Sequence, residues 1–348
     1  MTSAGGPQGP AQGYPPNPQG APPPANSGNL QSEVHTLERA IFEVKRIIVG
    51  QDLLVERMLV GLLAKGHVLL EGVPGVAKTL AVETFARVVG GTFARIQFTP
   101  DLVPTDIVGT RIYRQGKEEF DIELGPVVCN FLLADEINRA PAKVQSALLE
   151  VMQEHQVTIG HNTFPVPDPF LVLATQNPIE SEGTYPLPEA QVDRFMLKVL
   201  IGYPEHDEEL TIVQRQLADE PELRQVLSLE ELKALQATVR SIYVDPQLIS
   251  YAVDVATATR EPTDYVAYGV SPRGPISLVQ SARALAVVRG REYVLAEDLQ
   301  SLAKDALRHR LVLTYQALAE ERSADDVLDA VLTAVPQPRL ELGRPAAA

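Results

Sequence analysis

Cysteine, metal-binding histidine patterns and long apolar runs are scarce or missing in this sequence of 348 residues. The only cysteine is Cys129, so an intramolecular disulfide is excluded, and the six histidines fall in no metal-ligand spacing such as His-Glu-x-x-His. No apolar run approaches the roughly 18–20 residues that span a bilayer, and the N-terminus lacks the charged and apolar segments of a signal peptide. We therefore expect a soluble, cytoplasmic protein without membrane insertion.

Basic side chains are in the minority. Thirty Lys and Arg residues stand against forty-five Asp and Glu residues, which gives a formal net charge of −15. A polyanion would be repelled unless a local basic track overrode this charge. We therefore expect no nucleic acid partner.

Charged side chains are absent from the first 27 residues, a tract rich in Pro, Gly, Gln, Ala and Asn with Tyr14 as its only aromatic residue. Such a tract cannot bury enough apolar surface to offset its ordering entropy. We expect a disordered tail over residues 1–28, with a docking arm as the alternative. The Pro- and Ala-rich end, residues 337–348, is expected to be frayed.

The chain is long enough for two domains, because single cores rarely grow past roughly 250–300 residues. Short apolar runs at residues 67–70, 129–134 and 170–174 alternate with helical patterns, which predicts a parallel sheet covered by helices over residues 29–204. Beyond residue 204 only helix signals recur, among them a Ser-x-x-Glu capping box at residues 228–231. We therefore predict a second, all-helical domain over residues 205–336.

A Gly-rich run follows the first apolar run and opens a helix, which is the context that a phosphate-binding loop requires. Its backbone N–H groups would cradle the phosphates of ATP, Lys78 would neutralise the β- and γ-phosphate oxygens, and the Thr79 hydroxyl would ligate Mg²⁺. Ala77 stands where the last glycine of such a loop is usual. The alternative is a Gly-Pro turn before a helix that happens to contain Lys-Thr. The candidate nucleotide-binding residues are Gly72, Val73, Pro74, Gly75, Val76, Ala77, Lys78, Thr79 and Leu80.

Two acids follow the second apolar run, whose end reads Phe131-Leu132-Leu133-Ala134-Asp135-Glu136. A strand end would place Asp135 beside the phosphate-binding loop, where it can hold Mg²⁺ through water while Glu136 polarises the attacking water. Alone, such a pair is often a solvated turn. Its order after a phosphate-binding loop favours ATP hydrolysis.

Two further residues are candidates for the same reaction. Asn177 follows the third apolar run, and an amide at the tip of a strand between the first two can position the lytic water and sense the γ-phosphate. A turn or capping asparagine is the alternative. Residues 188–195 predict a helix that ends in Arg194 at the domain edge, where a surface salt bridge is the usual role of an arginine.

Five stretches resemble the successive sequence boxes of MoxR-type AAA+ ATPases. They are VGQ (49–51), GVPGVAKT (72–79), LLADEINRAPAKVQSALLEVMQEHQVTIG (132–160), LATQNPIESEGTYPLPEAQVDRFMLKV (173–199) and GVSPRGPISL (269–278). The resemblance covers roughly residues 30–336, and an alanine at position 77 agrees with the family. It implies a P-loop AAA+ fold, with a doubly wound αβα sheet and a C-terminal all-helical lid.

The resemblance also implies roles for single residues. Arg194, in the Asp-Arg-Phe box, would act on the nucleotide of the neighbouring subunit. Arg273, in the lid, would contact the γ-phosphate of its own subunit, and Val49 and Gly50 would lie by the adenine. The implied catalytic set is Glu136, Asn177, Arg194 and Arg273, and the implied Mg²⁺ ligands are Thr79 and Asp135.

Two hairpin insertions are implied as well, one over Ile112–Phe120 and one over Val157–Phe164, which would point into a ring pore or onto one face. Ordinary surface hairpins are the alternative.

The family implies a homo-oligomeric ring, expected to be a hexamer, that remodels or matures protein partners, often proteins with von Willebrand factor A domains. Three alternatives are a magnesium-chelatase-like motor subunit, a DNA-dependent helicase-like ATPase, and a nucleotide-regulated scaffold.

Overall fold

The computed structural model describes residues 27–73, 75–76, 78–116, 118–177, 184–217, 222–261 and 263–338. The tails expected at both ends lie almost wholly outside these residues. Helix α1 (Ser27–Ile47) begins at Ser27, so the last two residues of the expected N-terminal tail belong to this helix. In the described residues, no helix combines the length and apolarity that crossing a membrane requires.

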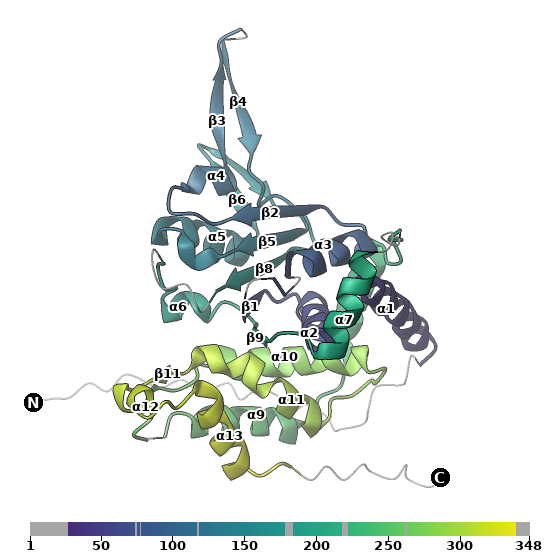
Figure 1. The fold of residues 1–348 in the computed structure, drawn as a ribbon, viewed down its shortest axis with the longest axis vertical. Coiled ribbons are helices and arrows are strands. Elements are labelled where there is room, and N and C mark those ends of the chain that lie inside the picture. Colours follow the sequence, from purple (N-terminus) through teal and green to yellow (C-terminus); the bar gives the residue numbers. More distant parts are fainter. Residues whose placement is uncertain are drawn as a thin grey trace, which may run out of the picture.

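A parallel five-stranded sheet forms the centre of the molecule, with the strand order β2-β5-β8-β1-β9 (Figure 1). All four neighbouring pairs are parallel. Strand β8 lies between β1 and β5, as expected for the strand that ends beside Asn177. The strands are β1 (Val68–Gly72), β2 (Phe93–Gln97), β5 (Phe131–Asp135), β8 (Leu171–Gln176) and β9 (Leu197–Ile201).

Alternate residues of the buried strands enter two different cores, because successive side chains of a strand point to opposite faces. Leu69 packs with helix α5 on one face, whereas Val68 and Leu70 pack with helices α1, α2 and α3 on the other. The predicted αβα architecture is confirmed. The helices and the short 3-10 helix that accompany the sheet are α2 (Asp52–Leu63), α3 (Lys78–Val89), α4 (Pro104–Val108), η1 (Ile137–Arg139), α5 (Ala142–Glu154) and α6 (Glu189–Val192).

The C-terminal part is the helical lid, which lies below the sheet in Figure 1 and shares the apolar core of helices α2 and α3. Ser228 accepts a hydrogen bond from the Glu231 N–H, which confirms the predicted capping box. The lid also contains an antiparallel pair, β10 (Val266–Tyr268) and β11 (Val312–Leu313), too short to give a strand pattern. Beyond β9 the helical elements are α7 (His206–Gln216), α8 (Leu229–Ser241), α9 (Pro246–Ala258), α10 (Arg273–Val288), α11 (Ala296–Leu307), η2 (Arg308–Arg310), α12 (Tyr315–Ala319) and α13 (Ala324–Ala334).

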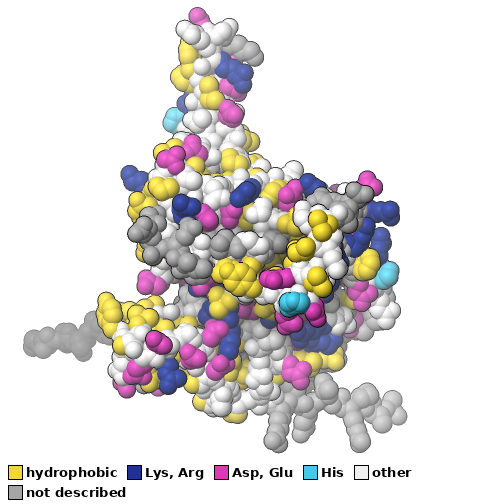
Figure 2. Space-filling model, in the orientation of Figure 1, with side chains coloured by type: hydrophobic (Ala, Val, Ile, Leu, Met, Phe, Trp, Pro, Cys, Tyr) yellow, Lys and Arg dark blue, Asp and Glu magenta, His cyan; other side chains and the backbone are white. Residues whose placement is uncertain are grey.

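Both predicted hairpins are present. Strands β3 (Gly109–Arg114) and β4 (Glu119–Leu124) pair antiparallel and project from the body (Figure 1), and β6 (Gln156–Ile159) pairs with β7 (Asn162–Pro165). Apolar side chains are exposed on the β3–β4 hairpin beside charges of both signs (Figure 2).

Candidate functional site

The phosphate-binding loop joins the end of β1 at Gly72 to the start of α3 at Lys78. Gly75 has a φ of +85°, and a Cβ there would meet no atom within 4 Å, so glycine is required by the backbone conformation rather than by crowding. A Cβ on Gly72 would lie 2.5 Å from the carbonyl oxygen of Ile201, so the loop begins in close contact with β9. Pro74 and Ala77 lie outside the described residues.

Lys78 folds back onto this loop. Its Nζ donates a hydrogen bond to the Gly72 carbonyl oxygen at 2.8 Å. Burial lowers the pKa of Lys78, and the nearby carboxylates of Asp135, Glu136 and Glu71 oppose that shift. The first N–H groups of the twelve-residue helix α3 have no acceptor within the helix. Together with the ammonium and the half-buried Thr79, they surround one place where an anion is favoured.

The acid pair stands at the end of β5, where Thr175 of the neighbouring strand β8 connects its two members. The Thr175 hydroxyl donates to Asp135 Oδ1 at 2.6 Å and accepts a hydrogen bond from the Glu136 N–H at 2.8 Å. Arg95 Nη2 donates to the other oxygen of Asp135 at 2.7 Å. Neither Thr175 nor Arg95 was identified from the sequence.

Glu136 adopts a left-handed backbone conformation, with a φ of 56°. Its Oε2 accepts hydrogen bonds from Gln97 Nε2 at 2.8 Å and from Arg139 Nη1 at 2.9 Å. Gln97 is the last residue of β2, on the far side of β5 from β8. Two side chains that the sequence analysis missed therefore hold the carboxylate expected to polarise water.

Asn177 directly follows β8 and is buried. Because parallel strands end at one edge of the sheet, it lies on the same edge as the phosphate-binding loop after β1 and the acids after β5. The expected placement of these three motifs at one sheet edge is therefore confirmed.

The Val49-Gly50-Gln51 segment reaches that edge too. Gln51 Nε2 donates to the carbonyl oxygen of Gly202, which follows β9, at 3.1 Å. Gly50 has a φ of +65°, and a Cβ there would lie 2.5 Å from a carboxylate oxygen of Glu208 on α7. The start of α7 therefore lies against the segment expected near the adenine.

Arg194 lies at the opposite edge of the sheet, where the parallel strands begin. The Met196 N–H donates to the carbonyl oxygen of His67 at 2.8 Å, so this segment meets the first residues of β1 and β9. Strand β1 has five residues, which at about 3.3 Å each separates the two edges by about 16 Å. Arg194 is therefore remote from Lys78 of its own chain.

Arg273 shares this far edge, which corrects the expectation that it meets the γ-phosphate of its own subunit. Its Nη1 lies 3.9 Å from Asp193 Oδ2, and it lines a hollow of about 240 Å³ together with Arg194, Lys65 and His67. The physical reason is the packing of α10 on α2, which turns the first residue of α10 toward the start of β9.

The side chains at the loop edge fit Mg²⁺. A hydroxyl at Thr79 and a carboxylate at Asp135 are hard oxygen ligands, and Mg²⁺ is commonly held by one or two carboxylates together with substrate phosphates. Among the described residues, no group of three or more His, Cys, Asp or Glu side chains forms a metal cage of its own.

A phosphate-binding loop, an acid pair and a buried asparagine at one edge of this sheet, with a helical lid behind it, define a P-loop ATPase of the AAA+ class. Residues 67–197 match the ATPase family associated with various cellular activities (AAA), and residues 258–331 match the AAA lid domain. The chain belongs to the MoxR family of these ATPases.

Relatives and a solved structure support this assignment along most of the chain. The chain is 62% identical to Chaperone MoxR1 of Mycobacterium tuberculosis, over 98% of this chain and 94% of that protein. It is 32% identical to Protein MoxR of Paracoccus denitrificans, over 84% of this chain and 93% of that protein. A crystal structure from Cytophaga hutchinsonii, assigned as an ATPase, is 44% identical and superposes with a TM-score of 0.85, covering 90% of this chain and 98% of that one.

Proposed function

We propose that this ATPase works as a ring in which each catalytic site is shared by two subunits. The observation that carries the proposal is the position of Arg194 and Arg273, which lie together on the sheet edge opposite Lys78. A head-to-tail ring sets one edge of each subunit against the opposite edge of the next, so both arginines would reach the neighbour's nucleotide.

Within one site the residues of this chain would divide the work of ATP hydrolysis. Bound Mg²⁺ would neutralise charge on the phosphate oxygens, with Thr79 and Asp135 as its protein ligands. Lys78 binds the β- and γ-phosphates, Glu136 polarises the attacking water, and Asn177 orients that water. Val49 and Gly50 border the adenine. Gly202 and Glu208 contact the same segment, through Gln51 and Gly50 respectively.

We further propose that the ring, a hexamer in the cytoplasm, remodels protein clients, among them proteins with von Willebrand factor A domains. The exposed apolar side chains Ile112, Tyr113 and Phe120 on the projecting hairpin support a protein rather than a nucleic acid client.

The core would extend over residues 29–204 and the lid over 205–336. Helix α7 links the two, since Arg215 donates to the Lys45 and Arg46 carbonyl oxygens of α1.

A mixed-ring experiment tests the shared site. Arg194→Ala should bind ATP and hardly hydrolyse it, because an arginine finger contributes about 10³–10⁵ in rate. Lys78→Ala has the reverse defect, since its own loop is damaged and its Arg194 is intact. In rings assembled from equal amounts, about a quarter of the interfaces would join an intact loop to an intact arginine.

ATPase activity that returns on mixing supports action between subunits. Full activity of Arg194→Ala alone would exclude the arginine-finger role. A mixture that stays inactive, although mixed rings are seen by native mass spectrometry, would contradict independently working shared sites.

A further inference from the structure

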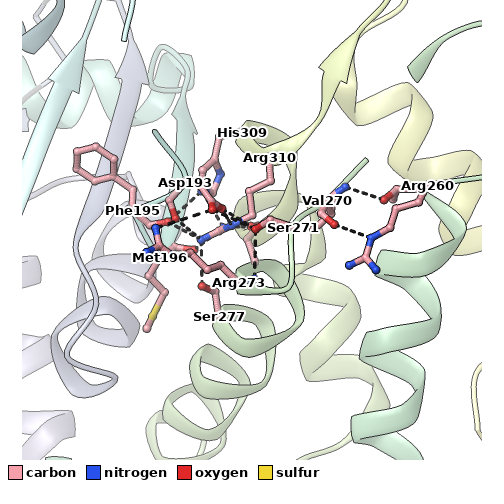
Figure 3. A network of polar contacts seen from close by, with 12 residues as sticks. Asp193, Phe195, Met196, Arg260, Val270, Ser271, Arg273, Ser277, His309 and Arg310 are labelled. Atoms are coloured by element: carbon pink, nitrogen blue, oxygen red, sulfur yellow. Dashed lines mark hydrogen bonds and ion pairs between the residues drawn. The ribbon is translucent and has the colours of Figure 1, made fainter. Parts of the chain in front are cut away.

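The guanidinium of Arg310 donates hydrogen bonds to the backbone on both sides of Arg194 (Figure 3). Its Nη2 donates to the carbonyl oxygens of Asp193 at 3.2 Å and Phe195 at 2.8 Å, and its Nη1 donates to that of Met196 at 3.3 Å. Its Nε donates to the Asp193 carboxylate at 2.8 Å. The turn that carries Arg194 is therefore held through the backbone carbonyl groups of residues 193, 195 and 196, which lie on both sides of Arg194.

Arg310 belongs to the lid and is itself firmly held there. Its side chain is 1% exposed, and it donates to the Ala306 carbonyl oxygen at the end of α11 and to the Ser277 hydroxyl of α10 at 3.0 Å. Burial lowers the pKa of Arg310 to about 10, against the opposing effect of Asp193, so the guanidinium stays charged at neutral pH.

A second lid residue holds the same turn. The Ser271 hydroxyl lies 3.0 and 3.1 Å from the two carboxylate oxygens of Asp193, just before α10. Asp193 thus accepts hydrogen bonds from Arg310 and Ser271, and Arg273 approaches the same carboxylate. The lid, rather than the sheet alone, therefore fixes the position of the backbone that carries Arg194.

We propose that Arg310 is a positioning residue for Arg194, acting through the backbone of residues 193–196. This inference rests on the proposed role of Arg194 at the neighbouring subunit's nucleotide. A guanidinium suits the task because its planar N–H donors serve several acceptors in fixed directions, whereas an ammonium is a point charge. A change at Arg310 should therefore damage the neighbour's catalytic site and leave its own subunit's loop intact.

Arg310→Lys tests this inference, because it keeps the charge beside Asp193 and removes the planar donor set. Displacement of a catalytic group by about 1 Å can cost on the order of 100-fold in rate, so kcat should fall about 10- to 100-fold with little change in the KM for ATP. Arg308→Lys is the matched control. Arg308 lies in the same 3-10 helix and is 10% exposed, but it binds Asp305, Asp325 and the Lys198 carbonyl oxygen instead of residues 193–196. Its kcat should stay near that of the unmodified protein.

Mixed rings then locate the defect on one side of the interface. Arg310→Lys mixed with Lys78→Ala should regain activity, because each Lys78→Ala subunit supplies a well-positioned Arg194 to an intact loop. Arg310→Lys mixed with Arg194→Ala should not, because both lack a competent arginine. The opposite pattern would show that Arg310 supports its own subunit's nucleotide site, and it would overturn the proposal, as would unchanged kcat.

The reference mixture of Lys78→Ala with Arg194→Ala separates this inference from the proposed function. If the reference mixture regains activity while neither Arg310→Lys mixture does, the lid is damaged as a whole and only the positioning role fails. If Arg194→Ala is fully active alone, the finger role fails, and the positioning role fails with it.

Discussion

Thr175 donates a hydrogen bond of 2.6 Å to the Asp135 carboxylate, and the same hydroxyl accepts one of 2.8 Å from the Glu136 N–H. Thr175 is 1% exposed, so water does not readily replace either bond. Strand β8, which ends beside Asn177, thereby sets the orientation of both acids on the neighbouring strand β5. The proposed Mg²⁺ ligand and the proposed water-polarising residue share one structural support.

Thr175→Val should weaken the use of Mg²⁺ by this ATPase, because valine keeps the shape of the side chain and removes both hydrogen bonds. Loss of a partner that orients a metal ligand typically costs about 10–100-fold in metal affinity or activity. A titration of ATPase rate against Mg²⁺ should show a half-maximal concentration raised by that order. Thr175→Ser, which keeps the hydroxyl, should stay near the unmodified protein. An unchanged Mg²⁺ dependence in Thr175→Val would contradict the assignment of Asp135 as a Mg²⁺ ligand.

Lys78→Ala and Glu136→Gln should fail at different steps. Lys78→Ala removes the cation that binds the β- and γ-phosphates, so ATP binding itself should weaken. Glu136→Gln removes a group needed only when water attacks, so binding should persist while kcat falls by about 10²–10⁴. Measurements of fluorescent-nucleotide binding and of ATPase rate on each variant separate a loss of binding from a loss of turnover. Lys143 is exposed, so Lys143→Ala serves as a control. Equal loss of binding in both variants contradicts the assigned roles.

The main strands and the motif order could be predicted because both rest on local patterns. β1, β5 and β8 each begin with a continuous apolar run, and a phosphate-binding loop followed by an acid pair constrains where each run ends. Strand β2 lacks that signal, since Phe93 and Ala94 are only half-buried and Arg95 and Gln97 are exposed. Missing this strand meant missing Gln97, which contacts Glu136 only because two distant segments pair.

The positions of the lid residues depend on packing that no local pattern encodes. Arg273 was expected in an all-helical lid, but the packing of its helix α10 on α2 decides which edge of the sheet that arginine reaches. Arg310 follows a helix end and comes directly after Arg308 and His309, and such a cluster of basic residues is typical of a solvated surface. Its burial becomes understandable only with the carbonyl acceptors of residues 193–196 in place, more than a hundred positions earlier in the chain.

The protein should not bind nucleic acid at physiological salt. Strands β6 and β7 carry no Lys or Arg. On the other hairpin, the Arg111 guanidinium lies 4.8 Å from the centre of the Phe120 ring and Arg114 pairs with Asp121 at 2.9 Å. Counterion release would therefore be small, and we expect no submicromolar affinity for single-stranded DNA or RNA at about 150 mM salt. Fluorescence anisotropy at several salt concentrations checks this. Tight binding, or stimulation of the ATPase by single strands, would favour a helicase-like function instead.

His67 makes the stability of the fold sensitive to acid. The ring is buried where β1 begins, with Nε2 donating to the Met152 carbonyl oxygen at 3.2 Å and Nδ1 accepting from the Val172 N–H at 3.0 Å. These two partners require a neutral ring that is protonated on Nε2. Burial lowers the pKa of His67 from 6.5 to about 4, with a smaller contribution from His155 in the same direction.

Acidification should therefore destabilise the protein through His67. Above pH 6.5 the ring is neutral in both the folded and the unfolded chain, so it adds no pH dependence. Between pH 6.5 and 4 the unfolded chain takes up a proton that the folded ring refuses, and the free energy of unfolding should fall by up to about 3 kcal/mol. His67→Asn, whose side-chain oxygen can still accept from Val172, should lose this part of the pH dependence. Urea unfolding at a series of pH values measures it, and the exposed His35→Asn should behave like the unmodified protein. An equally steep loss of stability in His67→Asn would assign the acid sensitivity to other groups. The half-buried His309, whose pKa is also lowered, would be the first to examine.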